Sequence, residues 1–93
     1  MDAIAILAAL AEPTRLAAVR VLRDGGEHCV CDLMRTLNVS QSRMSRHMAA
    51  LKFAGLVTDR RDAQCIRYRR NANLPAPVNV LVEAVLNLTE VRR

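Results

Sequence analysis

The chain has 93 residues, of which 52% are hydrophobic and only 2% aromatic, and its formal net charge is +5. Chains of this length rarely divide, so the sequence predicts a single domain over residues 1–93, with a core of small aliphatic side chains. The positive charge favours a polyanionic partner, nucleic acid before a membrane surface. The surplus of apolar residues suggests that a second subunit covers part of the surface.

Three cysteines cannot form a complete set of disulfides within one chain. The first apolar run, residues 3–11, is too short to cross a bilayer, lacks a basic leader and meets Glu12 and Pro13. We therefore expect a cytoplasmic protein with reduced thiols and no membrane partner.

Two helices are expected in the first part of the chain. Residues 3–11 are apolar almost all round, which predicts a helix that is buried on more than one side. Pro13 suits the first turn of a second helix over residues 14–23, and Gly25 and Gly26 end that helix by allowing left-handed backbone conformations.

A short helix over residues 32–37, a turn over 38–40 and a longer helix over 41–54 follow. Ser40 is a good N-cap for the longer helix, because its hydroxyl can accept a hydrogen bond from an amide of the first turn. One face of this helix is apolar, with Met44, Met48 and Leu51 at helical spacing. A separate arc is mostly polar and holds Gln41, Ser42, Ser45, Arg46 and Ala49.

Two mixed polar and apolar runs, which open at Leu56 and Ile66, predict an antiparallel hairpin with residues 62–64 as its turn. That turn contains no glycine, so the sequence leaves its type open. The hairpin has a basic rim formed by Arg60, Arg61, Arg67, Arg69 and Arg70. After Pro75 and Pro77, a last helix is predicted from apolar residues at helical spacing, namely Val78, Leu81, Val82, Val85 and Leu88.

This order of elements predicts a winged helix-turn-helix, a mainly α fold with a β-hairpin wing (α+β). In such a domain the longer helix enters the major groove, where short polar side chains near its start reach base edges. Gln41 can pair with adenine, and Arg46 can reach guanine or a phosphate. The expected contacts from this helix are Ser40, Gln41, Ser42, Arg43, Ser45, Arg46 and His47, and those from the wing are Arg60, Arg61, Arg67 and Arg69. The wing contacts would track the DNA backbone, and His47 could equally be a packed, hydrogen-bonded imidazole.

The stretch EHCVCDLM, residues 27–34, places two cysteines one residue apart just ahead of a helix. Two thiolates at this spacing can bind one soft ion if the backbone is extended or distorted there, because side chains two residues apart diverge in a helix. We therefore hypothesise that ligand pulls residues 30–32 out of helical form and shifts the DNA-reading helix. Packing of Cys29 and Cys31 as small apolar residues is the alternative.

Nearly the whole chain resembles the ArsR/SmtB family of metal-responsive repressors. AEPTRLAAVRVL is similar to the family's second helix, VSQSRMSRHMAALKFAGLV to its recognition unit and RRDAQCIRYRR to its wing. EHCVCDLM resembles the motif with which its arsenic sensors bind trivalent arsenic or antimony. The resemblance implies that Cys29 and Cys31 are ligands, that the chain is not an enzyme, and that a homodimer joined through the first and last helices leaves double-stranded operator DNA when the inducer binds.

The third ligand stays open, because the arsenic sensors often have a cysteine where this chain has Met34, and a neutral thioether is a poor substitute for a thiolate. Cys65 could complete the site within a chain or across the dimer, or could pack as a small hydrophobic residue, which is the commoner role of a free cysteine. An exogenous thiol or water is the remaining option. No zinc is expected in the last helix, which contains neither aspartate nor histidine.

Other functions fit parts of the pattern. Copper(I), cadmium, lead or thiol oxidation could be the signal on the same scaffold. A small thiol metal carrier, from a different functional class, would leave the DNA-reading helix without a purpose and need not show salt-dependent binding to DNA. A constitutive DNA-binding protein without a working sensor would ignore added metalloid.

Overall fold

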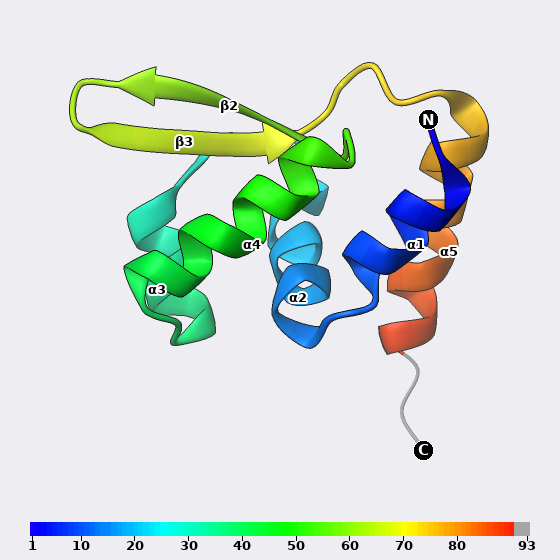
Figure 1. The fold of residues 1–93 in the computed structure, drawn as a ribbon, viewed down its shortest axis with the longest axis horizontal. Helices are drawn as coiled ribbons and strands as arrows, with labels where there is room; N and C mark the ends of the chain where they lie inside the picture. The colour runs from blue at the N-terminus through cyan, green and yellow to red at the C-terminus, as the bar shows by residue number, and fades with distance from the viewer. Residues whose placement is uncertain (91–93) are drawn as a thin grey trace.

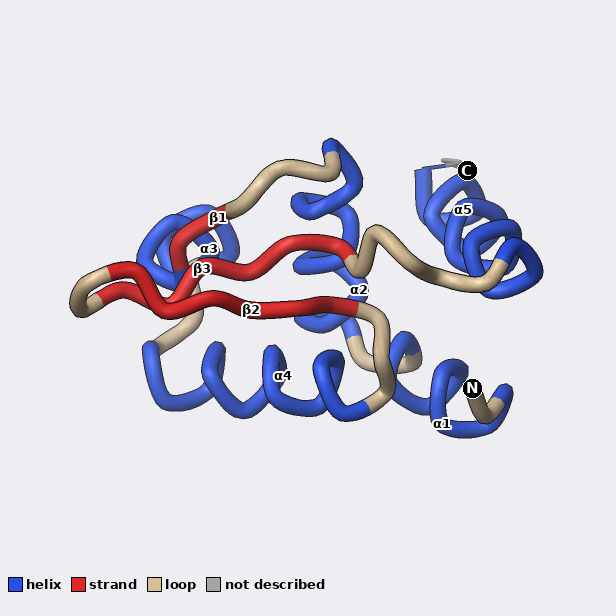
Figure 2. Tube along the Cα trace, turned by 90° about the horizontal axis from the view of Figure 1, so that it is seen from above, coloured by secondary structure: helices blue, strands red, loops and turns tan. Residues whose placement is uncertain are grey.

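A computed structural model describes residues 1–90 of the chain. Its elements are, in chain order, α1 (Ala3–Leu10), α2 (Pro13–Val21), the 3-10 turn η1 (Leu22–Asp24), β1 (His28–Cys29), α3 (Val30–Leu37), α4 (Gln41–Phe53), β2 (Val57–Asp62), β3 (Cys65–Arg70) and α5 (Ala76–Glu90). The hairpin of β2 and β3 lies along one side of α3 and α4 (Figure 1), while α1 and α5 both lie at the end away from the hairpin turn and are separated from each other in Figure 2. None of the helices within residues 1–90 combines the length and the apolarity needed to cross a membrane.

The predicted hairpin is present, and it belongs to an antiparallel sheet of three strands in the order β1-β3-β2 (Figure 2). The sequence did not predict β1, which is only two residues long and pairs His28 with Tyr68 and Cys29 with Arg67. So short a strand shows no alternation of its own, and its pairing with β3 depends on residues far along the chain. As a result, Cys29 lies against the wing.

Three predicted helix starts differ from those in the structure. The second helix, expected from residue 14, begins at Pro13. The helix expected from residue 32 begins at Val30, with Cys29 as its N-cap. The last helix begins at Ala76 rather than after Pro77. Proline is tolerated in the first turn of a helix because its missing amide hydrogen has no partner there, so Pro77 does not delay the start.

The core confirms the predicted packing face of α4. Met44, Met48 and Leu51 are fully inaccessible to solvent, together with Leu33 of α3 and Leu86 of α5. Tyr68 of β3 is the one aromatic side chain among the buried residues, so small aliphatic and thioether side chains build the core as expected.

Within one chain, α1 is not buried on more than one side as the sequence predicted. Ile6 and Leu10 are buried, whereas Ile4 is 72% exposed. On α5, Val80 is 68% and Leu88 71% exposed. Large apolar side chains are thus left in contact with solvent at the end of the molecule where α1 and α5 lie.

Candidate nucleic-acid interface and thiol cluster

The turn between α3 and α4 gives the two helices their helix-turn-helix arrangement. Asn38 follows α3 in a left-handed conformation, with φ of 57°, and the amide of Val39 donates to the Met34 carbonyl at 3.1 Å. Ser40 then starts α4 as its N-cap, and its hydroxyl accepts a hydrogen bond from the Arg43 amide at 3.4 Å. The predicted turn and cap are therefore confirmed.

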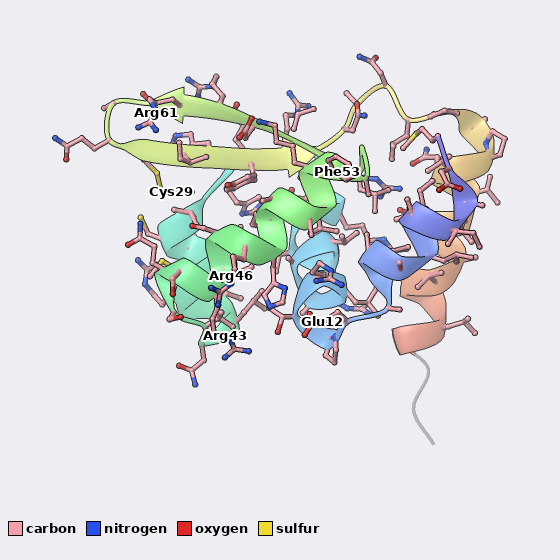
Figure 3. The ribbon with its side chains drawn as sticks, viewed as in Figure 1. Glu12, Cys29, Arg43, Arg46, Phe53 and Arg61 are labelled. Atoms are coloured by element: carbon pink, nitrogen blue, oxygen red, sulfur yellow. A yellow bond between two sulfur atoms is a disulfide. The ribbon has the colours of Figure 1, made fainter. Side chains whose placement is uncertain are left out.

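The predicted polar arc of α4 lies on the surface. All five of its residues, Gln41, Ser42, Ser45, Arg46 and Ala49, are exposed, and so is the neighbouring Arg43. Arg43 and Arg46 form no ion pair with any side chain that the structure describes, and Figure 3 draws both on the outer side of α4. Two uncompensated positive charges beside short polar side chains are what phosphate and base-edge contacts require.

His47 lies at the edge of this arc and contacts α2. Its Nδ1 atom lies 3.7 Å from Glu12 Oε1 and 3.3 Å from the Arg15 guanidinium, and the side chain is 16% exposed. Burial opposes ionisation of Glu12, but the Arg15 amide and the charge of His47 outweigh it and lower the pKa of this carboxyl. This geometry favours a packed, hydrogen-bonded imidazole, while a DNA contact by His47 stays a prediction.

The arginines of the wing do not form one uniform basic rim. Arg60 donates to Glu27 at 2.6 and 2.9 Å, and Arg67 donates to Asp62 at 2.9 Å. The hydrogen bond and the charge of Arg60 lower the pKa of Glu27, and Glu27 raises the pKa of Arg60 in return. Arg61 and Arg69 are exposed and have no ion-pair partner among the described side chains. They are the uncompensated cations of the wing.

At the end of the hairpin away from its turn, hydrogen bonds connect the wing to α5. Arg70 donates to Glu83 and Asn79, and Glu83 also accepts a hydrogen bond from Arg23 at 2.7 Å. The hydrogen bonds of Arg70 and then of Arg23 lower the pKa of Glu83. Arg70 is therefore a structural residue that joins β3 to α5, and not part of the exposed rim.

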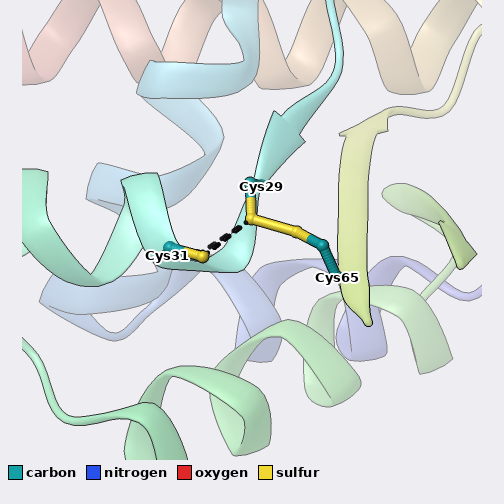
Figure 4. A group of neighbouring side chains, drawn as sticks. All are labelled: Cys29, Cys31 and Cys65. Atoms are coloured by element: carbon teal, nitrogen blue, oxygen red, sulfur yellow. Dashed lines mark hydrogen bonds between the residues drawn. A yellow bond between two sulfur atoms is a disulfide. The ribbon is translucent and has the colours of Figure 1, made fainter. Parts of the chain in front are cut away.

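The three cysteines meet although they come from three elements: Cys29 ends β1, Cys31 is the second residue of α3 and Cys65 opens β3. Their sulfur atoms all lie within 4.8 Å of one another (Figure 4). The sheet register explains the approach, because Cys29 is opposite Arg67, and Cys65 lies on the same face of β3 as Arg67. We call these three residues the thiol cluster.

Cys29 and Cys65 form a disulfide, with their Cα atoms 6.4 Å apart, and Cys31 remains free and exposed. The expectation of reduced thiols therefore does not describe this structure, and Cys65 does not simply pack as an apolar residue, because the unpredicted strand β1 brings Cys29 beside it. The Sγ atom of Cys31 lies 2.9 Å from that of Cys29. The cluster thus combines a disulfide with a third sulfur in contact with it.

The local backbone explains how Cys29 and Cys31 can meet. Cys29 is extended, with φ −66° and ψ 145°, and α3 begins with the next residue. The Cys31 amide donates to the Cys29 sulfur at 3.4 Å, as at a helix N-cap, where partial positive charge favours an anion. The two sulfurs therefore come together while residues 30–32 are helical, and ligand-driven unwinding of this segment stays a hypothesis.

His28 does not face the thiol cluster in the way a ligand would. Its Nε2 atom lies 3.0 Å from the Asp24 carboxylate. The Gly26 amide and then the His28 side chain lower the pKa of Asp24.

Met34 is half-buried and borders two cavities beside Cys31.

The helix-turn-helix, the exposed cationic face of α4 and the hairpin beside it define a DNA-binding transcription regulator of the winged helix-turn-helix class. A family described as "Bacterial regulatory protein, arsR family" matches residues 5–59. The chain belongs to this family of regulators. It is therefore a transcriptional repressor of the ArsR type and not an enzyme, and its curated relatives include arsenic-resistance regulators.

Two relatives carry arsenic resistance in their names. The chain is 40% identical over 81 residues to the "Arsenic resistance transcriptional regulator ArsR2" of Pseudomonas putida, a match that spans 87% of this chain and 70% of that protein. It is 45% identical over 67 residues to the "Arsenical resistance operon repressor" of Escherichia coli, spanning 72% of this chain and 57% of that protein. The chain thus covers only part of these relatives.

Solved structures agree with the fold. "Reduced HlyU from Vibrio cholerae" superposes with a TM-score of 0.80 at 32% identity, covering 96% of this chain and 90% of that one. The homodimeric winged helix-turn-helix DNA-binding domain of Mb0332 from Mycobacterium bovis has a TM-score of 0.77 at 26% identity, covering 94% of this chain and 77% of that one.

Proposed function

We propose that the chain represses transcription by binding operator DNA as a homodimer, and that trivalent arsenic or antimony releases it by binding Cys29, Cys31 and Cys65. The observation that carries the proposal is the approach of the three sulfur atoms to within 4.8 Å of one another. Trivalent arsenic takes three soft ligands in a pyramid, and cysteine thiolates are the soft ligands that proteins offer. The names of the arsenic-resistance relatives support this choice of inducer.

The binding reaction needs all three thiols. Arsenous acid would form three As–S bonds and break three As–O bonds, and each thiol proton would leave with a hydroxide as water. The Cys29–Cys65 disulfide must first be reduced, either by a dithiol, which gives two electrons and two protons and becomes a disulfide, or by a phosphine, which gives two electrons and becomes a phosphine oxide while water supplies the protons. Cys65 would thereby supply the ligand that Met34 cannot.

On DNA, the proposed contacts come from α4 and the wing. Gln41, Ser42, Ser45 and Arg46 would face the major groove, and Arg43 would reach a phosphate. Arg61 and Arg69 would follow the backbone beside the groove, because their charges are not compensated by described side chains. Ser40 caps α4 and His47 packs against α2, so these two residues would contribute less to DNA binding.

The proposed dimer forms through α1 and α5, whose exposed apolar side chains Ile4, Val80 and Leu88 need a cover. The homodimeric state of the Mb0332 domain supports the same assembly. A dimer with two α4 helices would contact two half-sites on one side of the DNA.

The position of the thiol cluster suggests how binding is transmitted. The cluster joins α3, the first helix of the DNA-reading pair, to β3 of the wing. Three short bonds to one arsenic atom would fix the separation of these two elements, and the operator would favour a different separation. The coupling must be reciprocal, so operator DNA should weaken arsenic binding by the factor by which arsenic weakens DNA binding.

The test is a fluorescence-anisotropy titration of the fully reduced protein on its promoter, with a phosphine as reductant. Arsenite and antimonite are added to the preformed complex, and zinc, cadmium and copper(I) are added in separate runs. Release by arsenite or antimonite supports the proposal. If the complex persists in arsenite but dissociates in another run, the repressor function stands and the inducer is that metal.

The cysteine variants test the ligand set. Cys29→Ser, Cys31→Ser and Cys65→Ser should each retain DNA affinity and lose release by arsenite, because each removes one of three bonds to arsenic. Met34→Leu is the matched control, since it keeps the apolar volume and removes only the thioether sulfur. Normal release of Cys65→Ser would take Cys65 out of the site, and loss of release in Met34→Leu would make Met34 a ligand.

The Cys29–Cys65 disulfide favours thiol oxidation as a second candidate signal. One peroxide molecule would accept two electrons from the two thiols, giving the disulfide and two waters. Peroxide-treated and reduced protein should then differ in operator affinity, and Cys65→Ser should remove the difference while Cys31→Ser keeps it. Equal affinity of the two forms would exclude this signal.

A further inference from the structure

The side chain of Arg15, a residue of α2, joins three helices through one guanidinium group. Its Nε and Nη2 atoms donate to the carbonyls of Ala9 and Ala8, at 2.7 and 3.3 Å, in the last turn of α1. Its Nη1 atom lies 3.3 Å from Nδ1 of His47 on α4. The last carbonyls of a helix have no amide partner at the usual spacing, so a cation with several donors suits this end of α1.

The chemistry of the groups determines how His47 takes part. A guanidinium group only donates hydrogen bonds, so the Nδ1 atom of His47 accepts from Arg15. The Glu12 carboxylate lies 3.7 Å from the same Nδ1 atom, beyond hydrogen-bond distance. It accepts instead from the Arg15 amide at 2.9 Å and so caps the start of α2. We call Glu12, Arg15 and His47 the three-helix network.

This network lies between the two surfaces that the recognition of an operator by a dimer requires. On one side, α1 presents Ile4 and Leu7, which are 72% and 46% exposed, to the proposed dimer interface. On the other side, α4 carries the exposed Arg43 and Arg46 on its outer face (Figure 3). The bonds of Arg15 therefore connect the helix of the dimer interface with the helix that reads DNA.

We propose that Arg15 and His47 are positioning residues, which fix the angle between α1 and α4 and thereby set the half-site spacing that the dimer accepts on DNA. The inference rests on the homodimer of the proposed function, because only a dimer binds two half-sites. One base pair inserted between the half-sites moves them apart by about 3.4 Å and rotates them by about 35°. A dimer with α1 and α4 held at one angle binds such a duplex only with strain, whereas a dimer with a looser connection adjusts to it.

The shape of the guanidinium group makes Arg15 suitable for this role. Its donors point in fixed directions in one plane, so bonds to α1 and α4 from the same group determine how the two helices are oriented. Lysine has the same charge, but its ammonium group is a point charge on a flexible stem. Arg15→Lys should therefore loosen the connection while the net charge and the sequence-independent attraction to phosphates stay the same.

The experiment measures the spacing preference by fluorescence anisotropy. The reduced wild-type protein first selects an operator from random duplex DNA, and duplexes with one base pair removed or added between the half-sites are then titrated. The spacing ratio is the affinity for the selected duplex divided by the affinity for an altered one. Arg15→Lys should lower this ratio by about three- to tenfold, the factor that corresponds to the loss of about one hydrogen bond.

The matched control is Arg35→Lys. The exposed ion pair of Arg35 with Asp32, at 2.9 Å, joins two residues of α3 and no second helix, so this variant should keep the wild-type spacing ratio. A general loss of stability lowers the active concentration equally for every duplex and cancels in the ratio. An equal fall of the ratio in both variants would mean that any arginine-to-lysine change has this effect, and would overturn the proposal.

Two variants of His47 separate positioning from direct contact with DNA. His47→Asn places an amide oxygen on Cγ, the atom that carries Nδ1, so it can still accept from Arg15, whereas His47→Leu has no acceptor. His47→Asn should keep the spacing ratio, and His47→Leu should lower it as Arg15→Lys does. Loss of a phosphate contact would instead lower the affinity for every duplex by the same factor. If both variants lower the ratio equally, the hydrogen bond from Arg15 does not position α4 and the proposal is wrong.

The double variant tests whether the two residues act through one connection. Arg15→Lys and His47→Leu remove the same hydrogen bond, so their effects on the spacing ratio should not multiply. A ratio that falls by the product of the two single effects would overturn the network. A wild-type ratio near one would contradict the dimer of the proposed function together with this inference. A high wild-type ratio that Arg15→Lys leaves unchanged would overturn the inference alone.

Discussion

The carboxylate of Glu27 accepts two hydrogen bonds from the Arg60 guanidinium, at 2.6 and 2.9 Å, and joins the segment that leads into Cys29 to wing strand β2. Arg60 was expected to contact DNA as part of a basic rim. Its charge is instead compensated within the chain, whereas Arg61 and Arg69 keep theirs. Local acidic partners therefore decide which arginines of the wing are available to phosphates.

Glu27→Gln should release Arg60 for a phosphate contact. Each additional neutralised phosphate steepens the dependence of log K on log salt by about 0.9, so the variant should show a slope steeper by about that amount. Anisotropy titrations at several salt concentrations measure it. Adding Arg60→Ala to Glu27→Gln should restore the wild-type slope, and an unchanged slope in the single variant would mean that Arg60 does not reach the DNA.

Arg46→Ala should weaken operator binding by about 1–3 kcal/mol, the range for loss of one good base contact. The matched control is Lys52→Ala, which removes one positive charge from the last turn of the same helix, where Lys52 pairs with Asp59 at 3.0 Å. Competition binding on operator and random DNA measures both variants. A loss below about 1 kcal/mol for Arg46→Ala would take this side chain out of the groove.

Glu83 should make stability depend on acid pH. Its pKa in the folded protein is lowered from 4.5 by Arg70 and Arg23. The stabilisation is therefore fully present above a pH of about 4.5 and is lost as the pH falls through the lowered pKa. Glu83→Gln should be less stable than wild type at neutral pH, and the difference should shrink in acid. Urea unfolding at fixed protein concentration, over a pH series, measures it, and a difference that grows in acid would contradict the assignment.

Ala63→Asn should stabilise the wing. Ala63 has φ of 57°, a left-handed conformation that alanine adopts at a cost and asparagine tolerates. The expected gain in the free energy of unfolding is about 0.5–1 kcal/mol. Gln64→Asn, at the next turn position, is the control and should show no such gain. A destabilised Ala63→Asn would argue against a left-handed turn residue at this position.

The sequence predicted the features that depend on neighbours within a few residues. The period of Met44, Met48 and Leu51 defined the buried side of α4, and Ser40 marked its start. Both signals lie within one helix, where spacing alone determines which side chains share a face.

The features that the sequence missed are pairings between distant residues. Strand β1 exists because it pairs with β3, some 40 positions away in the register of His28 with Tyr68. The Cys29–Cys65 disulfide and the contact of Arg70 with Glu83 likewise join residues of different elements, β1 with β3 and β3 with α5. A cysteine count alone gave the number of thiols but could not place Cys65 against β1, because two residues of strand carry no recognisable pattern.

The sheet register has a practical consequence for spectroscopy. The chain contains one tyrosine and no tryptophan. That tyrosine, Tyr68, is 7% exposed and follows Arg67, the residue opposite Cys29, along β3. Near-ultraviolet emission from the unlabelled protein is therefore dominated by a single chromophore in the strand that joins the cysteines to the wing. Stopped-flow recording of this emission can measure the rates of arsenic binding and of disulfide formation at the sulfur atoms without an attached dye.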